Sequence, residues 1–229
     1  MNNKYINRSK ISEAKMRLFV RLFALDLNAS QIASITGLNR NTVNRLLTGL
    51  RQRLVLLCLE EQESSVREGK MHPLPPLPCP NATDAATGQP LPECPQYIGL
   101  KKQNGCIRIG GVPLPQSGRD DTARGVCQHS SELEKIACSQ GYDGLVDIYA
   151  RKFTRISRTI PPESSCSRCT HIDELESFWG FIKVRLIRFR GLPHKTLGPH
   201  LKECEFRFNH RQEDIYLLLL QELRKRPLF

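Results

Sequence analysis

The apolar residues in the first quarter of the chain recur at helical spacing, which predicts three consecutive helices. The first helix follows Ser12, a favoured N-cap residue, and carries its apolar residues at positions i, i+3, i+4 and i+7. The second is short, beginning at Ser30 as its cap and ending at Gly37. The third starts after Asn39 and carries one long apolar stripe. The stripes of the first and third helices are Met16, Phe19, Val20 and Phe23, and Val43, Leu46, Leu47, Leu50 and Leu54.

This pattern is lost between about residues 64 and 130. Ten of the fifteen prolines lie between Pro73 and Pro115, and neither helical nor strand periodicity lasts for more than a few residues. A stretch of this length without periodicity is unusual inside a compact domain. We therefore predict an irregular, disordered segment over residues 61–135.

Periodic order returns near Tyr142. The segment GLVDIYARKF is typical of short strands, and residues 173–190 are expected to form an amphipathic helix. Two further helices are expected over residues 195–208 and 213–224. The apolar stripe of the amphipathic helix is Leu175, Phe178, Trp179, Ile182, Leu186 and Phe189. Taken together, the patterns predict a mainly α chain with a smaller α/β part, divided into residues 1–60, 61–135 and 136–229.

Charge is concentrated in the first of these parts. The chain carries 34 Lys and Arg against 23 Asp and Glu, a formal net charge of +11. Residues 1–57 hold ten basic residues against two acidic ones, Glu13 and Asp26, which leaves +8 in this quarter. A local excess of this kind is typical of a surface that binds phosphate.

The composition also indicates a compartment. The longest apolar runs, LVLLCL and LLLL, are too short to span a bilayer, and no signal peptide is recognisable. Nine cysteines, an odd number without the spacing of a disulfide framework, favour free thiols in a reducing cytoplasm. The motif formed by Cys166, Cys169 and His171 could ligate zinc, but no second pair of ligands stands out.

The spacing of Ala33, Gly37 and Val43 within SQIASITGLNRNTVNRLL is that of a helix-turn-helix. A small residue lets two helices approach, glycine permits the positive φ of the turn, and the β-branched residue packs the second helix back. In the major groove, Asn pairs with adenine, and Arg with guanine or phosphate. We predict a specific DNA-binding surface made of Ser30, Gln31, Asn39, Arg40, Asn41, Thr42, Asn44, Arg45 and Thr48. The alternative, a small helical bundle with a polar surface, is disfavoured by the turn spacing and the charge.

Glu176, Gly180 and Lys183 share a second face of the amphipathic helix. Gly180 leaves room beside the carboxylate, and Lys183 offers a phosphate contact one turn further on. By itself, however, a carboxylate in a first turn only favours the positive end of the helix dipole.

Two sequence blocks carry a family resemblance. LESFWGFIKVRL followed by HLKECEFRFNHR closely resembles the C-terminal end of bacterial insertion-sequence transposases of the DDE type. NRNTVNRLL with the helices before it resembles the DNA-binding head of the same group, so the resemblance covers roughly residues 1–57 and 141–229. It implies that residues 136–229 are a remnant of a ribonuclease-H-like catalytic domain. It also implies that Glu176 is the third acid of a triad that holds Mg²⁺ ions for attack on a phosphodiester.

The other two acids that the resemblance implies are missing. The first belongs to a strand reading V-D-E-S-Y-F-G, and nothing between residues 57 and 101 matches it, although IGLKKQNG looks faintly like a family strand. The second belongs to a D-G-W-x-x-Y-x-G pattern, in which Ala137 takes the place of Asp and Ser139 that of Trp. Asp143 and Asp147 lie nearby but off the motif. Frameshifts in a decaying mobile element would produce this pattern.

These observations predict a transposase-family protein that binds insertion-sequence ends as double-stranded DNA and is catalytically impaired in strand cleavage and transfer. It would need Mg²⁺ only if active. The alternative is a non-enzymatic helix-turn-helix regulator or an inhibitor of transposition. Expected partners are DNA and a second copy of the chain or an intact transposase, with no membrane, in the bacterial cytoplasm at the nucleoid.

Overall fold

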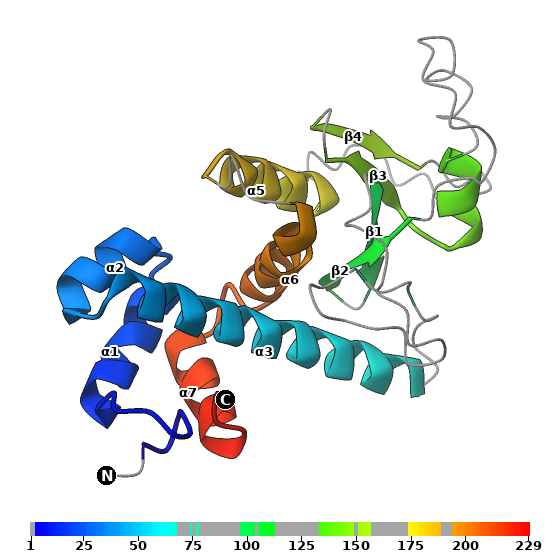
Figure 1. Ribbon diagram of the computed structural model, residues 1–229. Coiled ribbons are helices and arrows are strands. Elements are labelled where there is room, and N and C mark those ends of the chain that lie inside the picture. Colours follow the sequence, from blue (N-terminus) through cyan, green and yellow to red (C-terminus); the bar gives the residue numbers. More distant parts are fainter. Residues whose placement is uncertain are drawn as a thin grey trace. The chain divides into compact units, whose positions relative to one another are not determined.

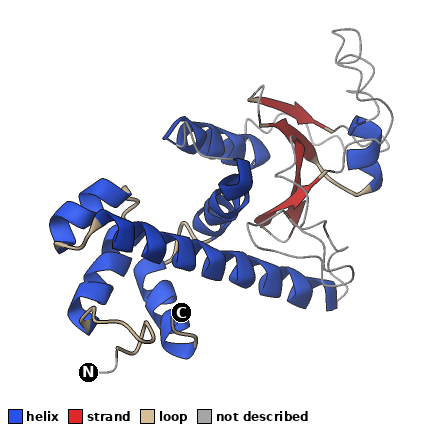
Figure 2. Cartoon of the chain, in the orientation of Figure 1, coloured by secondary structure: helices blue, strands red, loops and turns tan. Residues whose placement is uncertain are grey.

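The computed structural model describes residues 3–67, 74, 77, 97–103, 105–112, 133–148, 151–156, 174–188 and 194–229. These residues are mostly helical with a small antiparallel sheet (Figure 2), which confirms the expectation of a mainly α chain at this level. They belong to two compact units. Residues Met1–Cys58 and Phe206–Phe229 form one, here called the head unit, and Leu59–Glu205 form the other, here called the sheet unit.

The head unit begins with three helices, α1 (Glu13–Ala24), α2 (Ala29–Thr36) and the first part of α3 (Arg40–Arg67) (Figure 1). The Ser12 side chain accepts a hydrogen bond from the Lys15 amide, which confirms the predicted cap of α1. Gly37 ends α2 at a φ of +65°, as the turn prediction requires. Asn39 precedes α3, and its side-chain oxygen accepts a hydrogen bond from the Asn41 amide at 2.8 Å.

The prediction that Ser30 caps the second helix was wrong. The helix starts at Ala29, and the Asn28 side chain accepts a hydrogen bond from the Gln31 amide at 3.0 Å. The Gln31 side chain in turn accepts one from the Asn28 amide at 3.0 Å. Asn and Ser are comparable caps, and this reciprocal box satisfies two amide donors that a cap at Ser30 would leave open.

The core of the head unit draws on both ends of the chain. Every residue of the two predicted N-terminal stripes is buried. The same core contains Phe206, Leu219, Leu223 and Leu228, of which Leu219 and Leu223 lie on α7 (Ile215–Lys225), a helix that packs against α1. The C-terminal 24 residues, grouped by sequence with the third part of the chain, therefore complete the hydrophobic core of its first part.

The two ends of the chain also pair through their backbones. Ile6 and Leu228 form an isolated parallel β-bridge. The Asn7 amide donates to the Leu228 carbonyl, and the Leu228 amide donates to the Tyr5 carbonyl, each at 2.9 Å. Tyr5 and Ile6 are both buried. This pairing fixes the path of the segment that precedes α1.

We expect Leu219→Ala to lower the free energy of unfolding by about 2–5 kcal/mol, because it leaves a cavity in the shared core. Leu217→Ala is the matched control on the same helix, since Leu217 is 52% exposed, and its effect should stay within about 0.5 kcal/mol. Urea titration followed by circular dichroism measures both. Equal, small effects would show that α7 is not part of the core.

The sheet unit contains β1 (Tyr97–Gln103), β2 (Cys106–Gly111), β3 (Gly144–Asp147) and β4 (Lys152–Arg155). Their order is β2-β1-β3-β4, and each neighbouring pair is antiparallel. The pair β3 and β4 confirms the short strands predicted within GLVDIYARKF. A short helical stretch over residues 133–139 precedes β3.

The prediction of an irregular segment over residues 61–135 was wrong for residues 61–67, 97–103, 106–111 and 133–135, which belong to helices or strands. Leu74, Leu77, Gly105 and Val112 lie outside helices and strands. Residues 61–67 continue α3, and β1 and β2 pair antiparallel with Gln103 opposite Cys106 and two residues between them in the chain. The turn sequence is Asn-Gly, the commonest two-residue hairpin turn, and Gly105 has the required positive φ, +75°. The prolines on both sides obscured this short signal. The rest of the predicted segment lies outside the described residues.

Helices α5 (Glu174–Arg188) and α6 (His194–Asn209) match the predicted C-terminal helices, and α5 packs against β1 and β2. Leu175, Phe178 and Ile182 are buried, as the apolar stripe predicts. Trp179 is half-buried and stacks on Phe153 of β4, with ring centroids 6.4 Å apart. The side chains of the last two stripe residues, Leu186 and Phe189, lie outside what the structure describes.

A buried ionic cluster joins α6 to the edge strand β2. Lys202 donates to the Ile109 carbonyl at 2.9 Å and to Glu205 at 2.7 Å. Glu205 also accepts from the Ile109 amide at 3.0 Å and from Arg108 at 3.3 Å, and Arg108 pairs with Glu61 at 2.9 Å. Lys202 is 2% and Glu205 0% exposed. The cluster satisfies the N–H and C=O of Ile109, two groups of the edge strand that would otherwise be open to pairing with another strand.

Lys202→Met should lower the free energy of unfolding by about 3–5 kcal/mol, because it leaves the Glu205 carboxylate buried without its nearest cation. Arg67→Ala is the matched control, because it removes an exposed ion pair with Glu63, 3.7 Å long, and should cost no more than about 1 kcal/mol. Denaturant unfolding compares the two. If Lys202→Met behaves like Arg67→Ala, the cluster does not hold the sheet edge.

Two smaller expectations concern thiols and membranes. The four cysteines that the structure describes, Cys58, Cys106, Cys138 and Cys204, form no disulfide bond. None of the described helices has the length and apolar character needed to cross a membrane.

Candidate nucleic-acid interface

The first turns of α3 expose most of the polar side chains that the sequence predicts to contact DNA. Val43, Leu46, Leu47 and Leu50 are buried on the inner side of the helix. Because these residues fix the rotation of the helix, the polar positions between them face outward. The exposed polar residues are Arg40, Asn41, Asn44, Arg45 and Thr48, here called the α3 polar face.

The remaining predicted contacts are placed less uniformly. Ser30 and Gln31 are exposed in the first turn of α2. The side-chain Oε1 of Gln31 accepts the hydrogen bond of the capping box, which leaves the side-chain NH₂ for a ligand. Asn39 is exposed, and Thr42 is half-buried. Lys183 is exposed on α5 and belongs to the sheet unit, whereas all the other predicted contacts belong to the head unit.

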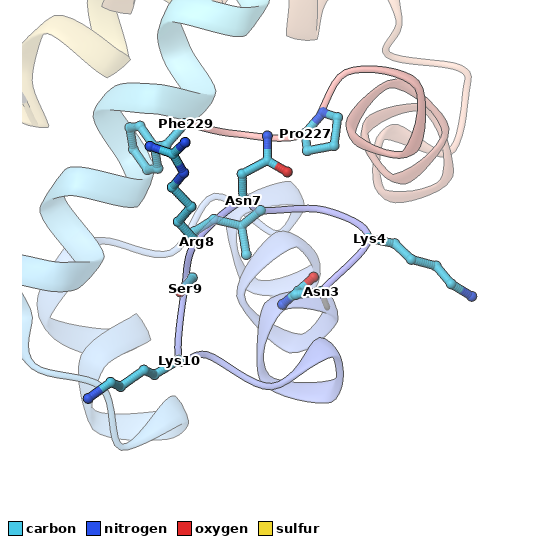
Figure 3. A pocket seen from close by; sticks show the side chains of 9 residues that line it. Asn3, Lys4, Asn7, Arg8, Ser9, Lys10, Pro227 and Phe229 are labelled. Atoms are coloured by element: carbon cyan, nitrogen blue, oxygen red, sulfur yellow. The ribbon is translucent and has the colours of Figure 1, made fainter. Parts of the chain in front are cut away.

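Two adjoining cavities lie beside the α3 polar face. One, of about 870 Å³, is lined by residues 3, 4 and 6–10 and by Pro227 and Phe229 (Figure 3). The other, of about 690 Å³, shares Ile6, Ser9 and Lys10 with it and extends to α1, the turn and the start of α3. Five lining residues are cationic, and no acidic side chain lines either cavity. We call these five residues, Lys4, Arg8, Lys10, Lys15 and Arg45, the basic trough.

Sequence reasoning found only one of these five cations as a contact. Arg45 lies within the helix-turn-helix pattern, whereas Lys4, Arg8, Lys10 and Lys15 entered only through the net charge. Periodicity could not find them, because three of them lie before α1. The one available signal was the density of Lys and Arg in the first fifteen residues.

Arg45 is positioned by the C-terminal segment. Its guanidinium lies 4.8 Å from the ring centroid of Phe229, at cation–π distance. The ring packs on α3 at Gly49, where a Cβ atom would come within 2.8 Å of it. Glycine in a helix interior costs about 0.5–1 kcal/mol relative to alanine, and here it allows the ring to lie under Arg45.

Glu176 lies on an open face of α5, as predicted. Glu176, Gly180 and Lys183 are all exposed, and nothing lies within 4 Å of the position that a Cβ on Gly180 would occupy. Glu174, two residues before Glu176, pairs with Lys102 of β1 at 2.9 Å. No group of three or more His, Cys, Asp or Glu able to hold a metal ion occurs among the residues that the structure describes.

The two other carboxylates near the expected motif are engaged within the sheet. Asp143 accepts a hydrogen bond from the Lys102 amide at 2.9 Å. Asp147 hydrogen-bonds the Tyr97 hydroxyl, and burial together with this carboxylate raises the pKa of Tyr97. Mg²⁺ prefers several oxygen ligands and keeps its waters when only one carboxylate is offered. The described carboxylates therefore do not fit a two-metal site.

We predict that the full chain neither nicks nor joins plasmid DNA in the presence of Mg²⁺ or Mn²⁺, because Glu176 offers only one strong ligand. Glu176→Gln should leave this result and the melting temperature unchanged. Agarose gel assays of supercoiled plasmid test the first point and thermal unfolding the second. Metal-dependent nicking that disappears in Glu176→Gln would refute the prediction and make Asp143 and Asp147 the next residues to replace.

Comparison with known proteins finds similarity to a transposase-like protein. The chain is 34% identical over 58 residues to an uncharacterized transposase-like protein of Haemophilus influenzae. The match covers 25% of this chain and 47% of that protein, so the chain spans about half the length of the relative it matches. No family model matches the chain, and no solved structure matches it. The similarity supports a transposase-related relationship.

Proposed function

We propose that this chain is a transposase-related DNA-binding protein whose head unit reads duplex DNA with α2, the turn at Gly37 and α3 as a helix-turn-helix. The observation that carries the proposal is the α3 polar face, which presents arginine, asparagine and threonine from a helix whose opposite side is buried. The similarity to a transposase-like protein and the excess of basic residues in the head support it.

The α3 polar face suits the edges of bases in the major groove. Arg40, Asn44 and Thr48 follow one another at intervals of four residues, so they lie along one line of the helix, about 6 Å apart. The major groove admits an α-helix, and Arg and Asn form bidentate hydrogen bonds with guanine and adenine. In this arrangement Arg40 and Asn44 discriminate bases, and Ser30 and the Gln31 amide contact the phosphate backbone from α2.

Within this class, the proposed target is the ends of an insertion sequence. The DDE assignment and the ribonuclease-H-like fold of the C-terminal region remain predictions from the family resemblance. Strand transfer is not part of the proposed function, because the described carboxylates do not converge on a metal site. A protein that binds such ends without cutting them would compete with an intact transposase and so act as an inhibitor or regulator.

Selection of bound duplexes from a randomised library, with the full chain, should enrich one sequence motif. Arg40→Ala combined with Asn44→Ala should abolish the enrichment, because each bidentate pairing with a base contributes about 1–3 kcal/mol of discrimination. The matched control is Arg224→Ala with Lys225→Ala, because both residues are exposed on α7 outside the proposed interface. This control should enrich the same motif as the native chain.

A native chain that enriches no motif over the starting library would contradict sequence-specific binding. A recognition variant that enriches the native motif would show that the bases are read elsewhere in the chain.

A further inference from the structure

We infer that the basic trough binds the phosphodiester backbone of the DNA duplex next to the bases that α3 reads. This inference rests on the proposed function and adds a second contact surface to it. The trough extends the interface from the helix-turn-helix to the segment before α1, which has no regular secondary structure beyond its bridge to Leu228.

The charge of the trough is uncompensated in the described part of the chain. Lys4, Arg8, Lys10 and Lys15 form no ion pair there, and Arg45 contacts an aromatic ring instead of a carboxylate. Arg17, which lies outside the trough, differs in this respect, because Glu13 pairs with it at 2.9 Å. Five cations in a lining that contains no acidic side chain form a positively charged surface, which attracts a polyanion.

The backbone that carries three of these cations is held in place. The Asn3 side chain donates to the Ile11 carbonyl at 2.9 Å and accepts from the Tyr5 amide at 3.0 Å. Ile6, which lies between Asn3 and Ile11 in the sequence, is buried and pairs with Leu228. Cations on an ordered backbone lose less conformational entropy when they bind a ligand than cations on a free tail.

Arg8 has a left-handed backbone conformation. Its φ is +46°, in the left-handed region that side-chain-bearing residues seldom adopt. Such conformations cost about 1–3 kcal/mol and cluster at functional sites. In Figure 3 the Arg8 side chain extends toward Phe229, and both residues line the first cavity.

The trough is continuous with the α3 polar face. Asn41, Thr42 and Arg45 line the second cavity and also belong to the predicted DNA contacts. A duplex whose bases lie against α3 would therefore bring a phosphate strand over Lys10 and Lys15. The cations are spread over two adjoining cavities and do not converge on one point, which fits an extended phosphodiester strand better than a single small anion.

Fluorescence anisotropy of the full chain with two duplexes tests the inference. One duplex carries the motif enriched by selection, and the other carries a scrambled sequence. Arg8→Gln combined with Lys10→Gln should weaken binding of both duplexes by the same factor. It should also lower the slope of log affinity against log salt by about 2, because two phosphates are then no longer neutralised.

Three comparisons make the result specific. Arg224→Gln with Lys225→Gln removes the same charge from α7 and should leave affinity and salt slope nearly native. Arg40→Ala with Asn44→Ala should reduce the preference for the motif and leave the affinity for the scrambled duplex largely unchanged. If the Arg8 and Lys10 variant unfolds, as judged by circular dichroism, Lys4→Gln with Lys15→Gln replaces it with the same expectation.

The inference about the trough is refuted if Arg8→Gln with Lys10→Gln keeps the native affinity and salt slope. If Arg40→Ala with Asn44→Ala loses the preference for the motif in the same experiment, the proposed function still stands. An equal loss in the α7 control would also overturn the inference about the trough, because net charge would then suffice. If no motif is enriched, the proposed base reading fails, and the scrambled duplex alone decides the trough. A native slope in the trough variant then refutes the inference.

Discussion

The pairing of the two chain ends is the constraint on which the head unit depends. The bridge between Ile6 and Leu228 holds the segment before α1, and α7 closes the core over α1 and α3. Because Phe229 follows Leu228 directly, the same pairing places its ring under Arg45. The C-terminal segment therefore supplies core residues, holds the segment before α1 and positions Arg45 of the α3 polar face. The proposed DNA-binding surface is in this sense a product of both ends of the chain.

The sheet unit obeys a different physical rule. A short antiparallel sheet exposes the backbone of its edge strands. In β2, the C=O and N–H of Ile109 form hydrogen bonds with Lys202 and Glu205 of α6. Charged groups at this depth are stable only as a set, since each one would be costly alone. Glu205, Asp143 and Asp147 take part in such structural contacts, whereas Glu176 is exposed. We therefore assign the proposed reading of bases to the head unit.

Sequence reasoning located the parts of the chain whose signal is periodic. The stripes from Met16 to Phe23 and from Val43 to Leu54 predicted buried helix faces, because burial of one face imposes a 3.6-residue repeat. It missed β1 and β2, since a hairpin of six or seven residues per strand offers few positions and its Asn-Gly turn lay among prolines. It also missed the N-cap at Asn28, where two residues with equal propensity compete and a reciprocal hydrogen bond decides.

The candidate site was predictable to a similar degree. The spacing around Gly37 predicted where α3 lies, and its buried apolar stripe then determines which residues face outward. The exposed residues of α3 could therefore be predicted from the sequence. The basic trough could not be found this way, because it depends on residues near position 6 meeting residues near position 228. Contacts of such long range have no local signature, and only the tertiary structure reveals them.

Hydrogen exchange of the full chain, followed by mass spectrometry with and without duplex DNA, tests most directly whether the segment before α1 and the helix-turn-helix form one DNA-binding surface. Bound duplex should slow exchange in peptides covering residues 3–12 and 37–45, and it should leave peptides covering residues 133–156 unchanged. Slower exchange confined to the sheet unit, or its absence from both head segments while DNA is bound, would contradict this account.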